Sequence, residues 1–356
     1  MRYVNAVKWL PLSLVCALSA FGAPVFFTDW HIARSAGHTL LSGDALSVYA
    51  DHPLAQMGPL ALLVAGLLPK SAYIVLVALL LTPFLQLCES VAPRDVPKSR
   101  VAICTGLGGA LLVYPWADFA EQGHIDDVLV LFGCALMLKA LQRRSAVLGG
   151  AAFALAVAAK PTALIAAPLL LPLGATAVSI AAASTAAVWL PFALADLHGF
   201  LASGKGVIDV RAGSLLDFVG YDPGSATPWW VRAIALGGGA LLCAVFVRRR
   251  DPARGLLAGF AVRAFIDPNP ATCYAATLVA LGLFADVGVR RVPWTAAVGM
   301  LGWMVSWRII LWPRLGWPRL VLTALSPVAA PRVRRPPVDG AARESTGEPL
   351  TAHSSG

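Results

Sequence analysis

Charged residues are scarce in this chain. Asp, Glu, Lys and Arg make up only 13% of its 356 residues, whereas apolar residues make up 58%, and the mean hydropathy is +0.72. Soluble domains carry about 25% charged residues, so this composition excludes a chain that folds alone in water. We therefore expect an integral membrane protein with lipid as its solvent.

Acidic residues are scarcer than basic ones, which leaves a formal net charge of +9. In a soluble chain such a surplus would raise the question of nucleic-acid binding. Here the basic residues fall mostly in short connections between apolar runs, where Lys and Arg set the orientation of membrane helices. No nucleic-acid partner is expected.

The six cysteines show no spacing typical of a metal site. All of them lie inside or at the edges of apolar runs: Cys16, Cys88, Cys104, Cys134, Cys243 and Cys273. Buried thiols of this kind usually behave as small hydrophobic side chains. The sequence thus predicts neither a disulfide nor a metal site.

Long apolar runs recur along the chain. A bilayer core about 30 Å thick needs roughly 20 apolar residues in a helix, and lipid offers no partner to unpaired backbone groups. The predicted fold is therefore all-α, a multi-spanning transmembrane helical bundle of about 10–12 helices. The predicted spans are residues 9–27, 70–88, 101–117, 126–141, 146–160, 162–175, 177–195, 229–247, 255–266, 271–288, 294–312 and 319–330. The shorter run 58–68 is predicted to be an interfacial or re-entrant helix that Pro69 ends.

Basic residues occupy alternate connections between these spans. The clusters are Arg94, Lys98 and Arg100; Arg143 and Arg144; Arg248, Arg249, Arg250 and Arg254; and Arg290 and Arg291. Because positive residues collect in the cytoplasm, both termini are predicted to be cytoplasmic and the protein to be a multi-pass protein of the cell membrane. Residues 1–330 then form one transmembrane unit with outer loops 28–57 and 196–228, and residues 331–356 form a disordered cytoplasmic tail.

The first predicted outer loop holds several ionisable residues. Asp29 follows the first apolar run directly, and Asp44 and Tyr49 come later in the same segment. A carboxylate at the mouth of a helix bundle is well placed to act as a general base. The alternative is an ordinary solvated loop acid.

Further candidates lie at the ends of later apolar runs. His124 and Asp126 open one run, where acids also favour the helix dipole, so helix capping is an alternative to ligand binding. Lys160 closes another run, and Arg263 lies one turn before Asp267. A charge at membrane depth costs several kcal/mol unless it finds a partner or reaches the surface. Anion binding, snorkelling and, for Arg263, pairing with an acid all remain open.

Taken in order, these pieces resemble a family pattern. The matching runs are Asp29-Trp30, then Gly43-Asp44 with Tyr49, then Gly58-Pro59-Leu60, then Gly123-His124-Ile125-Asp126, then a Gly-rich run ending at Lys160-Pro161, and finally Arg263 with Asp267-Pro268 and Tyr274. The chain is similar here to the GT-C class glycosyltransferases that use polyprenol-phosphate sugars, specifically glycosyltransferase family 87, which includes actinobacterial mannosyltransferases. It departs from the pattern at three positions, with Val48 in place of Pro, Gly58 in place of Pro and His124 in place of Gln.

The resemblance implies a GT-C-like fold and an inverting transfer of a sugar, mannose or a related one. The donor would be a polyprenyl-phosphate sugar in the membrane lipid, and the acceptor an envelope glycolipid or glycan on the outer face. It implies that Asp29 is the catalytic base, and it assigns substrate binding to Asp44, Tyr49, His124, Asp126, Lys160, Arg263 and Asp267. Neither a metal nor a cofactor is implied.

Two other functions stay open at this point. A secondary transporter or lipid-linked sugar flippase would call for ionisable residues near the bilayer midplane and for broken helices, whereas the charges here gather at one face. A non-catalytic subunit of an envelope-assembly complex is the second alternative.

Overall fold

The computed structural model describes residues 7–22, 29–205, 209–269, 271–287, 289–309 and 316–330. Within these ranges the chain is helical, and its only β-type pairing is an isolated bridge between Asp209 and Ala226. The all-α prediction is confirmed. The predicted tail, residues 331–356, lies outside the described residues.

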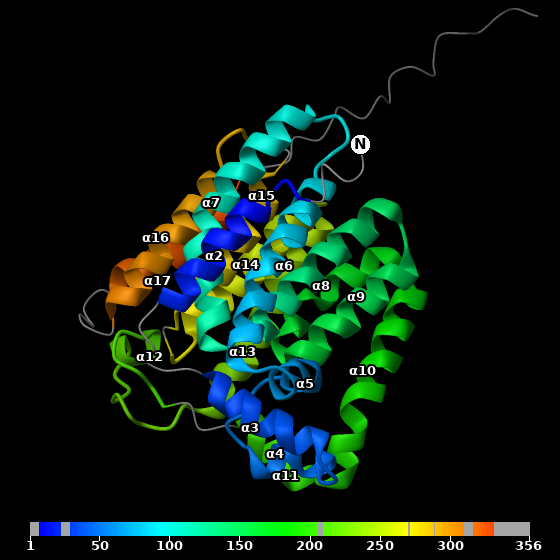
Figure 1. Ribbon diagram of the computed structural model, residues 1–356, viewed down its shortest axis with the longest axis vertical. Coiled ribbons are helices and arrows are strands. Elements are labelled where there is room, and N and C mark those ends of the chain that lie inside the picture. Colours follow the sequence, from blue (N-terminus) through cyan, green and yellow to red (C-terminus); the bar gives the residue numbers. More distant parts are fainter. Residues whose placement is uncertain are drawn as a thin grey trace, which may run out of the picture.

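The helices follow one another with short connections (Figure 1). In chain order they are α2 (Leu10–Gly22), α3 (Asp29–Leu41), η1 (Ala45–Ser47), α4 (Val48–Asp51), α5 (Pro59–Leu67), α6 (Lys70–Ser90), α7 (Lys98–Gln122), α8 (Ile125–Arg143), α9 (Ala146–Ala159), η2 (Pro161–Leu173), α10 (Ala175–Ala195), α11 (Leu197–Lys205), α12 (Leu215–Phe218), α13 (Trp229–Arg248), α14 (Pro252–Ile266), α15 (Thr272–Asp286), α16 (Trp294–Ile309) and α17 (Gly316–Ala329).

Four of the described helices, α6, α7, α10 and α13, are long and apolar enough to cross a membrane. Others, such as α2, α9, η2 and α15, are apolar but shorter. Each predicted span coincides with a helix, although length and composition support four membrane-crossing helices rather than the larger number predicted. This arrangement supports association with a membrane.

The predicted span 162–175 forms a 3₁₀ helix, η2, rather than an α-helix. Pro168 and Pro172 lie inside it, and each removes a backbone donor and disfavours the α-helical ladder. A 3₁₀ helix rises about 2.0 Å per residue, so the 13 residues of η2 extend roughly 26 Å, against about 20 Å for an α-helix of that length. A segment too short to span as an α-helix is thereby lengthened.

The bundle has two distinct ends in Figure 1. The lower end, which we call the cavity end, carries the short helices α3, α4, α5, α11 and α12. The opposite end, the basic end, carries the basic connections, and polar contacts join them there. Lys8 pairs with Glu89 at 2.6 Å, Arg100 donates to the Val289 carbonyl at 2.7 Å, and the Arg254 Nε donates to Pro327 O at 2.7 Å.

Both predicted outer segments contain short helices. Helices α3, η1 and α4 lie within residues 28–57, and α11 and α12 lie within residues 196–228. The apolar run 58–68 is a short helix, α5, that ends just before Pro69, as expected. Helices α3 and α5 approach closely through Gly37 and Gly66, where a Cβ at Gly37 would lie 2.2 Å from the Leu62 carbonyl oxygen. The backbones of α3 and α5 are thus in direct contact, and α3 packs closely against α5.

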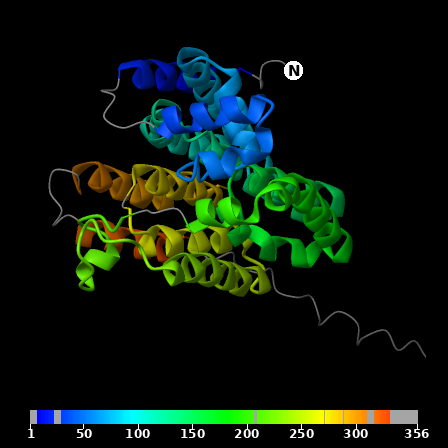
Figure 2. The same cartoon turned by 90° about the horizontal axis from the view of Figure 1, so that it is seen from below.

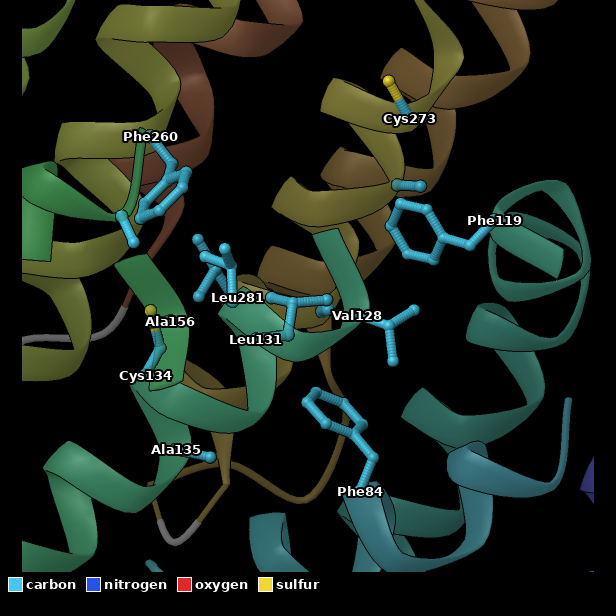
Figure 3. Close-up of a cluster of buried hydrophobic side chains, with 14 of the residues drawn as sticks. Phe84, Phe119, Val128, Leu131, Cys134, Ala135, Ala156, Phe260, Cys273 and Leu281 are labelled. Carbon is cyan, nitrogen blue, oxygen red and sulfur yellow. The ribbon is translucent and has the colours of Figure 1, made fainter. Parts of the chain in front are cut away.

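Aromatic side chains fill the core between α6, α7, α8 and α15 (Figure 3). The Phe84 ring lies 4.7 Å from the Trp116 ring and 5.3 Å from the Phe284 ring, and Trp116 Nε1 donates to Val77 O at 2.8 Å. All six cysteines are buried and free, as predicted. Seen from below, the blue N-terminal helices lie on one side of the bundle and the yellow-to-orange C-terminal helices on the other (Figure 2). The candidate site draws on both groups.

Candidate functional site

Two adjoining cavities lie at the cavity end. The polar cavity, of about 290 Å³, is lined by charged residues that include Asp29, His124, Asp126, Lys160 and Arg263. The apolar cavity, of about 350 Å³, is lined by aromatic and aliphatic residues together with Tyr49, Arg232 and Asp267. The two share part of their walls, namely Ala55, Gln56, Met57, Thr162, Arg263 and Tyr274.

Seven of the eight predicted site residues therefore line one cavity or the other, and these seven are Asp29, Tyr49, His124, Asp126, Lys160, Arg263 and Asp267. Asp44 lines neither cavity, and its side chain is exposed. It precedes η1 at a bend of the chain. The structure thus leaves Asp44 apart from the other candidates.

A glycine positions His124 beside Asp29. Gly123 ends α7 with φ +96°, and a Cβ there would lie 2.6 Å from the backbone of Trp30. The turn between α7 and α8 consequently rests on the first turn of α3. His124 Nε2 lies 3.6 Å from Asp29 Oδ2, and the Asp29 side chain is 57% exposed. Its carboxylate is therefore accessible from the polar cavity.

Lys160 is buried between two carboxylates. Its Nζ lies 2.7 Å from Asp126 Oδ2 and 2.7 Å from Asp127 Oδ2. Burial by itself would lower the pKa of Lys160, but the two carboxylates raise that pKa above its ordinary value. Lys160 is consequently charged and paired rather than snorkelling, and Asp126 does more than cap α8.

Arg263 belongs to none of the ion pairs found among the described residues. Its side chain is buried. The guanidinium carbon lies 4.4 Å from the centre of the Tyr274 ring, and Nη1 donates to Thr162 Oγ1 at 3.1 Å. A buried cation at the wall shared by both cavities, without a carboxylate in ion-pair contact, is well suited to bind an anion.

Asp267 follows α14 and is also buried. Its Oδ1 accepts a hydrogen bond from the backbone N–H of Asn269 at 3.0 Å. Burial raises the pKa of Asp267, and the nearby Arg263 partly opposes that rise. The predicted alternative, a direct Arg263–Asp267 ion pair, does not form in the structure.

Tyr49 belongs to the aromatic wall of the apolar cavity. Its ring lies 5.6 Å from the Trp189 ring and 5.8 Å from the Phe200 ring. Its hydroxyl donates to the Met57 carbonyl oxygen at 3.1 Å. The Tyr49 ring therefore contributes an apolar surface to the cavity, while its hydroxyl bonds the backbone of Met57 in the shared wall.

Position 58 carries glycine where the family pattern has proline, and the packing at this position requires the glycine. Its backbone N–H donates to Ala159 O at 2.6 Å, and a Cβ would lie 2.1 Å from the Ala158 carbonyl oxygen. A proline has no N–H and would clash. Glycine thus allows residues 55–57, which belong to the shared wall, to lie directly against the end of α9 next to Lys160.

The lining or pairing residues outside the predicted set include four with polar or sulfur atoms near the predicted ones: Asp127, Thr162, Arg232 and Cys273. Asp127 could have been suspected because it adjoins Asp126 in the first turn of α8. Cys273 gave no signal, because a thiol within an apolar run looks like any small hydrophobic residue. Arg232 lies near the start of α13, inside the predicted span 229–247, and nothing in the sequence singled it out.

No family model, curated protein or solved structure matches this chain. The case for a function consequently depends on the geometry of the two cavities and on the motif pattern of the sequence.

Replacing the buried cation tests the ion cluster of Lys160, Asp126 and Asp127. Lys160→Met leaves two buried carboxylates without their cation, which is expected to lower the free energy of unfolding by about 3–5 kcal/mol. Combining Lys160→Met with Asp127→Asn removes one of the two unpaired carboxylate charges and should restore part of the lost free energy of unfolding. Denaturant unfolding in detergent measures both, with the exposed Lys98→Met as control. Equal stability of Lys160→Met and Lys98→Met would refute a structural ion cluster.

Proposed function

We propose that this chain is a membrane glycosyltransferase that moves a sugar, mannose or a related one, from a polyprenyl-phosphate donor to an envelope glycolipid or glycan. One observation carries the proposal. An accessible carboxylate, Asp29, shares a polar cavity with the buried cations Lys160 and Arg263, and Arg263 also borders an aromatic-walled apolar cavity. A base, an anion site and a lipid-compatible surface thus adjoin one another, as a lipid-linked sugar phosphate requires.

The donor phosphate would bind at Arg263, because that guanidinium has no carboxylate in ion-pair contact. Arg232 lines the same apolar cavity and adds positive charge there. The first isoprene units would lie against Trp189 and Phe200. The sugar would then project past the shared wall into the polar cavity, towards Asp29.

The chemistry is a single displacement. The acceptor hydroxyl oxygen forms a bond to the anomeric carbon while Asp29 takes the hydroxyl proton. The bond from the anomeric carbon to the phosphate oxygen breaks, and its electron pair leaves with the polyprenyl phosphate. Fixed cations beside the leaving phosphate stabilise the charge that develops there. The transition state is oxocarbenium-like, and displacement from the opposite face inverts the anomeric configuration.

The placement in the membrane follows from the charge distribution. The basic connections collect at the end of the bundle opposite the cavities, and positive residues favour the cytoplasmic side. We therefore propose a multi-pass protein of the cell membrane with both termini cytoplasmic and the cavities on the outer face. The acceptor would then be an envelope component.

The alternative of a transporter or flippase is less well supported. The ionisable residues of the cavities gather at the cavity end. Between them and the basic end, the bundle is filled by side chains such as Phe84, Trp116 and Phe284. A transport pathway calls for polar groups near the midplane. A non-catalytic assembly subunit would use the same cavities only for binding. Sugar transfer by the purified protein alone would distinguish a glycosyltransferase from both a transporter and a non-catalytic subunit.

Replacing the proposed base tests the mechanism. Asp29→Asn is expected to lower the rate of sugar transfer in proteoliposomes by about 10²–10⁴-fold, because the acceptor hydroxyl loses its proton acceptor. Insertion and thermal stability should be unchanged, since the side chain is largely exposed. Asp95→Asn, on an exposed connection at the basic end, is the matched control. Unaltered transfer by Asp29→Asn would exclude Asp29 as the base.

Cysteine labelling tests the orientation. The native thiols are buried, so a thiol-specific reagent should react mainly with new cysteines placed at exposed serines. In intact cells a membrane-impermeant maleimide should label Ser42→Cys, at the cavity end, and should label Ser99→Cys, at the basic end, only after the cells are permeabilised. The reverse pattern would place the cavities in the cytoplasm and overturn the proposed acceptor.

A further inference from the structure

Three buried side chains with metal-binding atoms converge beside the polar cavity. His124 precedes α8, Asp127 lies in the first turn of α8, and Cys273 lies in the first turn of α15. Their ring nitrogen, carboxylate oxygen and sulfur atoms all lie within 4.8 Å of one another. The residues come from two helices far apart in sequence, so the tertiary fold brings the three atoms together.

The spacing of these atoms suits a shared ion better than direct hydrogen bonds. His124 Nδ1 lies 3.6 Å from Asp127 Oδ2 and 3.7 Å from Asp126 Oδ1, which is too long for a hydrogen bond. Ligands held about 2.0–2.3 Å from a tetrahedral zinc ion are roughly 3.3–3.6 Å apart. The His124–Asp127 distance already lies at this spacing. The three ligand atoms all lie within 4.8 Å of one another, so Cys273 would move closer to the other two ligands when the ion binds.

Two buried atoms at this point have no hydrogen-bond partner, namely His124 Nδ1 and Asp126 Oδ1. Both residues are more than nine-tenths buried. Buried polar atoms without partners are rare in folded proteins and often mark an ion or water that belongs there. The orphaned nitrogen is the atom of His124 that faces Asp127, so it is free to coordinate.

We propose that His124, Asp127 and Cys273 bind a divalent transition-metal ion of the zinc type, with a further coordination position open towards the polar cavity. Nitrogen, oxygen and thiolate sulfur form a typical zinc ligand set, and three protein ligands with an open position are typical of reactive sites. His124 and Cys273 line the polar cavity. This site departs from the expectation of no metal, which rested on the spacing of the cysteines and on the resemblance to the glycosyltransferase family.

A bound dication would offset negative charge in the immediate cluster. Asp29, Asp126, Asp127 and a Cys273 thiolate would carry four negative charges, and Lys160, Arg263 and the ion four positive ones. Asp209 and Arg211, which also line the polar cavity, offset each other. Metal binding releases the thiol proton, and Asp127 would serve both Lys160 and the ion.

A second carboxylate lies near the histidine. Coordination through Nδ1 leaves the proton on Nε2, which lies 3.6 Å from Asp29 Oδ2. A carboxylate–histidine–metal arrangement, which fixes the tautomer and the ring orientation of the ligand, would form here if these two atoms moved to hydrogen-bond distance. His124 replaces the glutamine of the family pattern, so the ion site would be specific to chains that carry this histidine.

Metal analysis of the full-length chain tests the site. Protein purified in detergent, stripped with chelator and equilibrated with zinc sulfate should retain about one zinc ion per chain after desalting. With cobalt chloride it should show a sulfur-to-cobalt charge-transfer band in the near ultraviolet. Zinc should also raise the unfolding temperature of the wild type, because it binds only the folded state.

The variants make the test specific. His124→Ala and Cys273→Ala should each lose the retained zinc, and Cys273→Ala should lose the charge-transfer band and the zinc-dependent rise in unfolding temperature. Cys243→Ala, at a buried thiol outside the site, should keep all three. Wild-type protein that retains less than a tenth of an equivalent, or equal retention by Cys273→Ala and Cys243→Ala, would overturn the proposal. Metal content is measured without a sugar substrate, so this test and that of glycosyl transfer fail independently.

Discussion

The pairing of Lys160 with Asp126 and Asp127 organises the cavity end of the protein. An isolated charge in this apolar bundle would be very costly, whereas three charges held together offset much of that cost. The pairing joins the start of α8 to the point where α9 ends and η2 begins. The pairing therefore links these two helix ends beside the polar cavity, which Asp126 and Lys160 line.

Close backbone approaches then bring the remaining groups to this cluster. Gly123 lets the turn before α8 rest on the first turn of α3, which sets His124 beside Asp29. Gly58 lets residues 55–57 lie against the end of α9. Side chains at these two glycines would push the outer segments away from the bundle. The accessible carboxylate and the buried cations are close because these positions carry no Cβ.

Hydropathy predicted the positions of the helices well, because charged connections bound most of the apolar runs, although residues 161–195 contain no charged residue. It did not predict the 3₁₀ form of η2, where prolines rather than apolar content decide the geometry. The short helices of residues 28–57 were not predicted, because a helix such as α3 is too polar overall to stand out in hydropathy, although its buried residues recur at helical spacing where it packs against α5.

Seven of the eight residues that the motif order selected line the cavities, but their pairing could not be predicted from the sequence. Nothing local shows that Lys160 meets Asp126 and Asp127, because 33 residues separate Lys160 from Asp127 in the chain. Asp44 fitted the motif yet lies away from the cavities. Cys273 became a candidate ligand only when α15 was placed beside α8.

We propose that one anion site, at Arg263, joins the two cavities. The most direct test is an experimental structure of the chain in lipid nanodiscs with a non-transferable polyprenyl-phosphate sugar analogue. The predicted result places the phosphate in hydrogen-bond contact with Arg263, the lipid chain beside Trp189 and Phe200, and the sugar in the cavity that Asp29 lines. A phosphate bound at the basic end, or a sugar remote from Asp29, would contradict it.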